Sequence, residues 1–174
     1  MVAKYNFAAC VPGSLVHGSE RPGNADELNK PAAISPAAVE KWGTFMKEQG
    51  MKHVLSLLND EEYAFYAEPG YVEGLQKAGF DKSKITCVNV FDAGAADKTE
   101  AALASAKAAG EKLVLHCSGG EGRTGVVLAQ WMAMEGIATT EACQQIIAHA
   151  SAQDCVRKPV AAKVDKFLTA RSLA

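Results

Sequence analysis

The sequence predicts an α/β protein in which helices flank a central, mostly parallel sheet. Short apolar runs alternate along the chain with segments of helical periodicity, as in proteins built from βα units. One helical segment separates the last two apolar runs and gives the crossover length that two parallel strands require. With 174 residues, 48% hydrophobic and 22% charged, the chain is expected to form a single domain over residues 1–174.

Turn and cap residues mark the elements of the first half. Pro12-Gly13 predicts a turn between two short strands. Ser35 can cap the first free N–H groups of a helix, Pro36 fits its first position, and Gly50 ends it. The predicted elements are two strands within residues 5–22, a helix over 36–49, a strand over 51–58 and helical stretches over 59–66 and 71–79.

The second half continues the alternation. Gly110 and Gly136 each end a helical run, and Thr139 or Thr140 can cap the helix that follows. The predicted elements are a strand over 85–90, a helix over 98–109, a strand over 112–115, and helices over 124–135, from 139 or 140 onward, and over 160–168.

The most informative stretch is LVLHCSGGEGRTG at residues 113–125, which predicts a strand, a tight loop and a helix. Glycines let the loop's amide N–H groups converge into an anion-binding nest, and the next helix directs its positive dipole end there. The fork of Arg123 suits two phosphate oxygens. The predicted phosphate-binding residues are Ser118, Gly119, Gly120, Glu121, Gly122 and Arg123.

Cys117 stands at the mouth of this loop. The field that attracts a phosphate also favours a thiolate over a thiol, and a thiolate facing a bound phosphate is a nucleophile. Thr124 can donate its hydroxyl to the sulfur, and His116 is expected to hold the loop through ring hydrogen bonds.

The run HCSGGEGRTG resembles the signature of cysteine-dependent protein-tyrosine phosphatases, with Cys117 and Arg123 separated by five residues. The order aromatic, then VPGSL, near the N-terminus is similar to small atypical dual-specificity members. The resemblance implies a protein-tyrosine-phosphatase-like fold and hydrolysis of phosphotyrosine, with phosphoserine and phosphothreonine also admitted. It also implies a phosphocysteine intermediate, with no metal or cofactor.

This chemistry requires a general acid. Asp92 follows the predicted strand over 85–90, which is where parallel sheets place their sites and where the family's aspartate falls. Asp97 is the alternative, but Asp97 and Glu100 together resemble a capping box, which would explain them structurally. We therefore assign the acid to Asp92.

Other charged residues receive structural assignments. Glu61 and Glu62 fit the first turn of a helix, and Arg21 and Arg157 are expected at the surface. Glu121 should point outward, where it would favour substrates with basic groups.

The remaining features bound the cellular setting. A net charge of −2 gives no sign of a nucleic-acid partner, and no apolar run is long enough to cross a membrane. Five scattered cysteines favour a reducing compartment, so we expect a cytoplasmic monomer acting on a phosphorylated protein. Cys87 is a candidate redox partner of Cys117.

Three other activities fit parts of the pattern. The same loop could serve phosphoinositides, inositol phosphates or RNA 5′-phosphates. It could also be a silent phosphate-binding module, or belong to a rhodanese-like sulfurtransferase, although the Arg-Thr-Gly exit suits the last less well.

Overall fold

The computed structural model describes residues 4–170, and its centre is a five-stranded sheet with the order β1-β2-β5-β3-β4. β1 runs antiparallel to β2, and the other neighbours are parallel. The predicted α/β architecture is therefore confirmed. The strands are β1 (Ala8–Ala9), β2 (Val16–Glu20), β3 (Met51–Ser56), β4 (Ile85–Cys87) and β5 (Lys112–Cys117).

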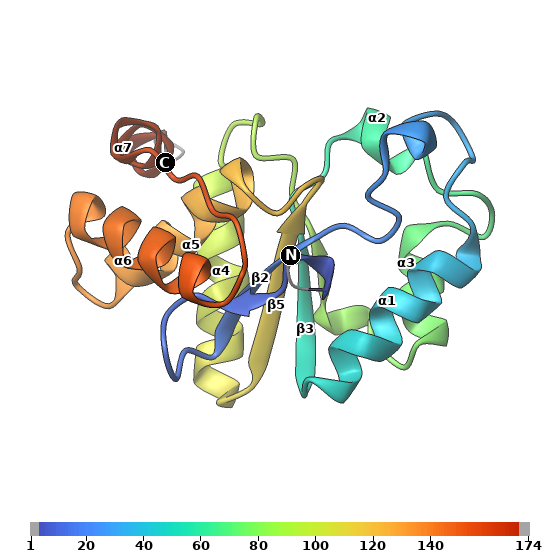
Figure 1. The fold of residues 1–174 in the computed structure, drawn as a ribbon, viewed down its shortest axis with the longest axis horizontal. Coiled ribbons are helices and arrows are strands. Elements are labelled where there is room, and N and C mark those ends of the chain that lie inside the picture. Colours follow the sequence, from blue (N-terminus) through green and yellow to red (C-terminus); the bar gives the residue numbers. More distant parts are fainter. Residues whose placement is uncertain (1–3, 171–174) are drawn as a thin grey trace.

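Helices cover both faces of the sheet (Figure 1). One apolar core joins the sheet to α1 (Pro36–Glu48) and α3 (Tyr71–Lys77). A second core joins it to α4 (Ala95–Ala109), α5 (Gly122–Met134), α6 (Thr139–Ala152) and α7 (Ala161–Thr169). The short helix α2 (Asp60–Tyr63) follows β3, and 3-10 turns form η1 (Lys4–Asn6), η2 (Asp26–Leu28) and η3 (Lys82–Lys84).

The central strand β5 is buried on both faces, and its alternation separates two functional neighbours. Leu115 and Cys117 face the core under α4 to α7, whereas Val114 faces the core under α1 and α3. His116 lies on the same face as Val114, with its ring centroid 5.3 Å from that of Trp42. Adjacent residues thus serve different layers of the protein.

Some predicted helix starts are confirmed and others are wrong. The Ser35 hydroxyl accepts a hydrogen bond from the Ala38 N–H at 3.3 Å, as expected for a cap. α4, however, starts at Ala95 after Gly94, so Asp97 lies inside its first turn and is not a cap. α6 follows Ala138 without a side-chain cap, so neither predicted threonine serves there.

Strand β4 is shorter than predicted. It ends at Cys87, and residues 88–94 form the irregular connection to α4. The shortening lengthens the loop that carries Asp92. Within residues 4–170, no helix is both long and apolar enough to cross a membrane.

Candidate active site

The loop from Cys117 to Gly122 lies where β5 ends and α5 begins, at the C-terminal edge of the parallel strands. Gly120 has a φ of 72°, and a Cβ there would lie 2.5 Å from the backbone oxygen of Ser19. Only glycine allows this close approach to the end of β2. Gly119 and Gly122 do not have a positive φ, so among the three loop glycines this conformational freedom is used at Gly120.

Cys117 is almost completely buried, with 4% of its surface exposed. The hydroxyl of Thr124 donates to its Sγ at 3.3 Å, as the sequence predicts. The first turn of α5 begins directly after the loop, so the positive end of its dipole lies close to the sulfur. The Thr124 hydroxyl and the start of α5 therefore both face the sulfur.

Arg123 is held by a carboxylate that sequence reasoning did not assign to the site. Its Nη1 donates to Glu62 Oε2 at 2.6 Å, and its Nη2 donates to Glu62 Oε1 at 2.6 Å. Nη1 also donates to the backbone oxygen of Leu57 at 2.8 Å. The hydroxyl of Ser118 donates to Glu62 as well. Glu62 therefore fixes both an arginine and a serine of the loop.

The prediction for Glu62 was correct in part. Its carboxylate accepts from the Asn59 N–H at 2.9 Å, and the Asn59 side chain accepts from the Glu62 N–H, which makes a capping box for α2. Burial favours the neutral acid, but hydrogen bonds from Arg123 and Ser118 outweigh it and lower the pKa of Glu62 to about 2. The sequence placed Glu62 in the first turn of a helix, as observed, but the capping box was not predicted and no sequence signal revealed the arginine contact.

His116 is fully buried behind the loop. Burial lowers the pKa of His116 to about 3, so its ring is neutral near pH 7. The hydroxyl of Tyr71 lies at hydrogen-bond distance from Nε2, and the Cys117 carbonyl lies 3.3 Å from Nδ1. A proton on Nδ1 satisfies both contacts, because Nδ1–H then donates to the carbonyl and Nε2 accepts from tyrosine. The expected loop-holding contacts of His116 are present.

Two arginines expected at the surface are buried beside the loop, which corrects both assignments. Arg21 is completely buried and its backbone N–H donates to the Ser118 oxygen at 2.9 Å. Its guanidinium lies over the ring of Phe65, 5.2 Å from the centroid. Arg157 is 4% exposed, and a Cβ on Gly18 would lie 2.8 Å from its Nε. Isolated charges near turns suggested solvent, but tertiary packing buries both side chains. Arg157 donates to the backbone oxygens of Val156 and Asn6. Arg21 Nη2 donates to the Asn29 side chain, whereas its Nε and Nη1 are buried without a hydrogen-bond partner among the described residues.

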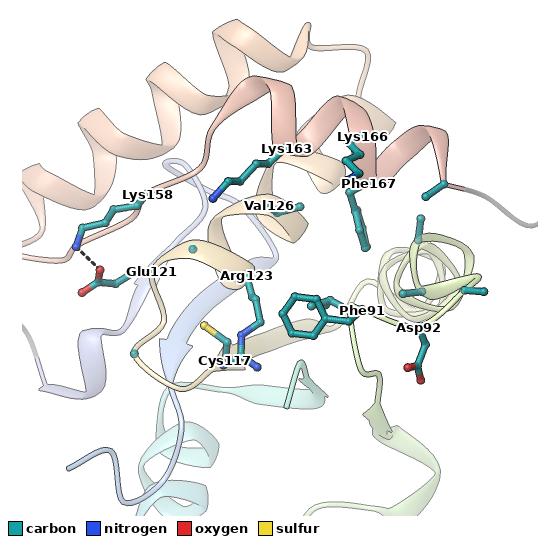
Figure 2. Close-up of a pocket in the computed structure, with 17 residues that line it drawn as sticks. Phe91, Asp92, Cys117, Glu121, Arg123, Val126, Lys158, Lys163, Lys166 and Phe167 are labelled. Carbon is teal, nitrogen blue, oxygen red and sulfur yellow. Dashed lines mark ion pairs between the residues drawn. The ribbon is translucent and has the colours of Figure 1, made fainter. Parts of the chain in front are cut away.

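A cleft of about 970 Å³ opens in front of the loop and is lined by Cys117, Arg123, Asp92 and residues of α7 (Figure 2). Asp92 therefore reaches the same cleft as the cysteine, and Asn89 Nδ2 donates to its Oδ1 at 3.1 Å. Its carboxylate points away from Cys117, and its neighbour Phe91 also lines the cleft. Asp92, the predicted general acid, thus lies at the rim of the cleft with its carboxylate directed away from Cys117.

The remaining candidates lie elsewhere or point outward. Glu121 projects from the loop and pairs with Lys158, with 2.5 Å between Oε2 and Nζ. Asp97 is in the first turn of α4 and does not line the cleft. Cys87 is exposed on β4 and also lies outside the lining, and all five cysteines are free thiols. Across residues 4–170, no cluster of three metal-binding side chains occurs.

Comparison with protein families agrees with this geometry. The family described as Swiss Army Knife protein, DSP-PTPase phosphatase domain, matches residues 32–166. The chain belongs to this phosphatase family. It is therefore a hydrolase of the dual-specificity phosphatase type. A sequence comparison with curated proteins found no match.

Solved structures share the fold of this phosphatase. Human DUSP28 is 12% identical, with a TM-score of 0.59 and 97% of each chain covered. Kinase-associated phosphatase with its catalytic cysteine replaced by serine is 16% identical, with a TM-score of 0.64, over 88% of this chain and 83% of that one. PTPMT1 in complex with PI(5)P is 13% identical, with a TM-score of 0.63, over 95% of this chain and 96% of that one.

Proposed function

We propose that this phosphatase hydrolyses phosphotyrosine in proteins, together with phosphoserine and phosphothreonine, through a phosphocysteine intermediate. The observation that carries the proposal is the convergence of three groups. The Thr124 hydroxyl donates to Cys117 Sγ at 3.3 Å. Arg123 lines the same cleft, and its guanidinium is held by hydrogen bonds to Glu62. A charged fork beside a stabilised thiolate suits a phosphate dianion.

In the first step the thiolate of Cys117 attacks phosphorus. A sulfur–phosphorus bond forms, the bond to the leaving oxygen breaks, and Asp92 gives its proton to that oxygen. The loop amides and Arg123 hold the three remaining phosphate oxygens as charge develops on them. The product alcohol or phenol departs and Asp92 is left as a carboxylate.

In the second step water attacks the phosphocysteine. Asp92 takes a proton from the water, an oxygen–phosphorus bond forms and the sulfur–phosphorus bond breaks. The Thr124 hydroxyl donates to the sulfur as it leaves, which lowers the cost of the new negative charge. Inorganic phosphate and the starting thiolate result.

The contacts of Arg123 support a specific binding mode. Its hydrogen bonds to Glu62, Leu57 and Ser118 all use the two Nη groups. We infer that Nε–H turns to a phosphate oxygen while Glu62 keeps the guanidinium plane fixed. Because the arginine is oriented before substrate binds, little side-chain entropy is lost on binding.

The outward position of Asp92 requires a loop movement. Residues 91–94 form the last part of the connection between β4 and α4 and include Gly94, which has a left-handed conformation with a φ of 72°. We propose that this segment turns when substrate binds, which brings the carboxylate over the leaving oxygen and moves Phe91 against the substrate.

We also propose a cellular compartment, an oligomeric state and a class of partner. All five cysteines are free, which supports a reducing compartment such as the cytoplasm. We propose a single catalytic domain that acts as a monomer on phosphorylated proteins, without a nucleic-acid or membrane partner.

Hydrolysis of p-nitrophenyl phosphate and of phosphopeptides by wild type and three variants tests the mechanism. We expect Cys117→Ser to abolish turnover while retaining phosphopeptide binding. Asp92→Asn should slow an alkyl phosphate much more than p-nitrophenyl phosphate, because p-nitrophenolate leaves without a proton. Asp97→Asn is the matched control.

Two results would contradict the proposal. Turnover by Cys117→Ser at the wild-type rate would exclude the phosphocysteine, and equal losses in the two aspartate variants would remove Asp92 as the acid.

A further inference from the structure

Lysines on α7 form one side of the cleft and lie apart from the phosphate-binding loop. Lys163 and Lys166 are both exposed and both line the cleft. Figure 2 shows Lys163 reaching from α7 toward the space above Cys117. Because α7 is about forty residues beyond the signature in sequence, the HCSGGEGRTG run gives no sign of this charge.

The charge on these two lysines is not neutralised within the described chain. Neither Lys163 nor Lys166 makes an ion pair with any residue between 4 and 170. The third lysine of the cleft, Lys158, is paired with Glu121. Since the whole chain has a net charge of −2, positive charge concentrated here attracts anions to this cleft specifically.

Glu121 consequently has a different effect from the one the sequence suggested. As a lone carboxylate on the rim it would attract basic groups. Its ion pair with Lys158 cancels that charge, so the two α7 lysines outnumber the one other carboxylate lining the cleft, that of Asp92.

Apolar side chains line another part of the same cleft. Phe91 is 74% exposed and lines the same cleft as Arg123. Phe167 and Val126 also contribute to the lining, and Phe167 points from α7 toward Phe91. Aromatic rings at this place suit the phenyl ring of phosphotyrosine, because aromatic pairs gain more than their buried area alone.

We propose that Lys163 and Lys166, named here the α7 basic subsite, bind acidic side chains next to the target phosphotyrosine. The inference rests on the proposed function and adds the substrate class: acidic phosphotyrosine peptides. The phosphate reaches Arg123, the ring packs on Phe91 and Phe167, and a neighbouring Asp, Glu or second phosphorylated residue meets the lysines.

The shape and lining favour a peptide over a lipid surface. The lysines face a cleft of about 970 Å³ that also contains Cys117. A basic cluster that serves membranes needs to meet many headgroups at once on an open face. An inositol ring also offers no aromatic face to Phe91. Peptide side chains on both sides of a phosphotyrosine can use the charged and the apolar lining together.

The test compares two phosphotyrosine peptides that differ only in their flanking residues, one with Glu and one with Gln. The measured quantity is the ratio of kcat/KM for the acidic peptide to that for the neutral one. We expect wild type to favour the acidic peptide at low salt and to lose the preference as salt rises. In Lys163→Glu/Lys166→Glu the ratio should fall about tenfold, the size expected when two weak surface attractions become repulsions.

Matched variants separate local from overall charge. Lys77→Glu makes the same type of change on α3, at the other face of the sheet, and should leave the ratio unchanged. Lys163→Gln/Lys166→Gln should give an intermediate ratio. Circular dichroism checks that each variant is folded.

The possible outcomes distinguish the inference from the proposed function. Equal kcat/KM for both peptides in wild type would overturn the subsite and leave the phosphotyrosine activity intact. An equal fall with Lys77→Glu would also overturn it, as would faster hydrolysis of a phosphoinositide in vesicles or a soluble inositol polyphosphate than of the acidic peptide. Absence of turnover with p-nitrophenyl phosphate and all of these substrates would reject the proposed function itself.

Discussion

At the scale of single residues, Glu62 performs two tasks that are far apart in the sequence. It closes the capping box of α2 with Asn59, and it holds Arg123, which is 61 residues away. The cap fixes the position of the carboxylate, so the arginine approaches an acceptor that is already oriented. A local helix signal is thereby converted into active-site geometry.

We predict that lowering the pH removes the stabilisation that the ionised Glu62 carboxylate contributes through Arg123. Because the folded-state pKa of Glu62 is lowered from 4.5 to about 2, its stabilising contribution is fully present above pH 4.5. It is lost as the pH falls through the folded pKa and amounts to roughly 3 kcal/mol. Urea denaturation of wild type and Glu62→Gln between pH 2 and pH 6 measures it.

The variant should be less stable near neutrality, because Arg123 loses its charged partner, and its stability should depend less on pH in the acid range. Its kcat should also fall. Parallel stability curves for the two proteins would contradict the role of the carboxylate. Glu61→Gln, an exposed neighbour in the same turn, is the control.

At the scale of elements, the phosphate-binding loop is shaped by its contact with the end of β2. Gly120 approaches the Ser19 backbone so closely that a side chain has no space. Arg21, just beyond β2, donates its backbone N–H to Ser118. The loop therefore takes its shape from the neighbouring strand as well as from its own glycines.

We predict that Gly120→Ala lowers stability and activity more than Gly110→Ala, a change at a glycine that lacks such a close contact. Gly110 has a similar left-handed φ of 63° at the end of α4, and a Cβ there meets nothing within 4 Å. Gly110→Ala should cost only the backbone strain of about 1–2 kcal/mol.

Gly120→Ala adds a clash with backbone atoms, so it should lower the thermal midpoint further and reduce kcat strongly. Differential scanning fluorimetry and p-nitrophenyl phosphate hydrolysis measure the two effects. Equal thermal shifts with unchanged activity would show that the close contact is unimportant.

At the scale of the whole molecule, the N-terminal and C-terminal segments meet at the loop. The Asn6 side chain donates to the Gly119 oxygen at 2.9 Å and accepts from the Val156 N–H at 2.8 Å. Arg157 donates to the Asn6 backbone oxygen at 2.7 Å. Residues 150 positions apart are thus joined around the phosphate-binding loop.

We predict that Asn6→Ala loosens the loop from a distance. It leaves a buried N–H and a carbonyl without partners, which should lower the free energy of unfolding by about 1–3 kcal/mol. The kcat should fall because the loop is less well fixed. Asn24→Ala removes an exposed hydrogen bond to Glu20 and serves as the control. Denaturant unfolding and steady-state kinetics measure the two effects. Equal changes in the free energy of unfolding and in kcat for both variants would contradict the prediction.

The sequence alone determined the features that depend on neighbours along the chain. Alternating apolar runs predicted the parallel sheet, Ser35 and Pro36 predicted a helix start, and the spacing from Cys117 to Arg123 predicted a phosphate-binding loop. Each pattern is local, because strand alternation, helix capping and loop geometry involve residues a few positions apart.

Only the tertiary structure decided which distant groups complete the site. It brought Glu62 to Arg123, buried Arg21 and Arg157, and placed the lysines of α7 along the cleft. The physical reason is that burial of a charge depends on partners supplied by packing, which the spacing of residues in the chain does not encode. The sequence thus specified the cysteine that we propose as the nucleophile, and the fold specified the charges that surround it.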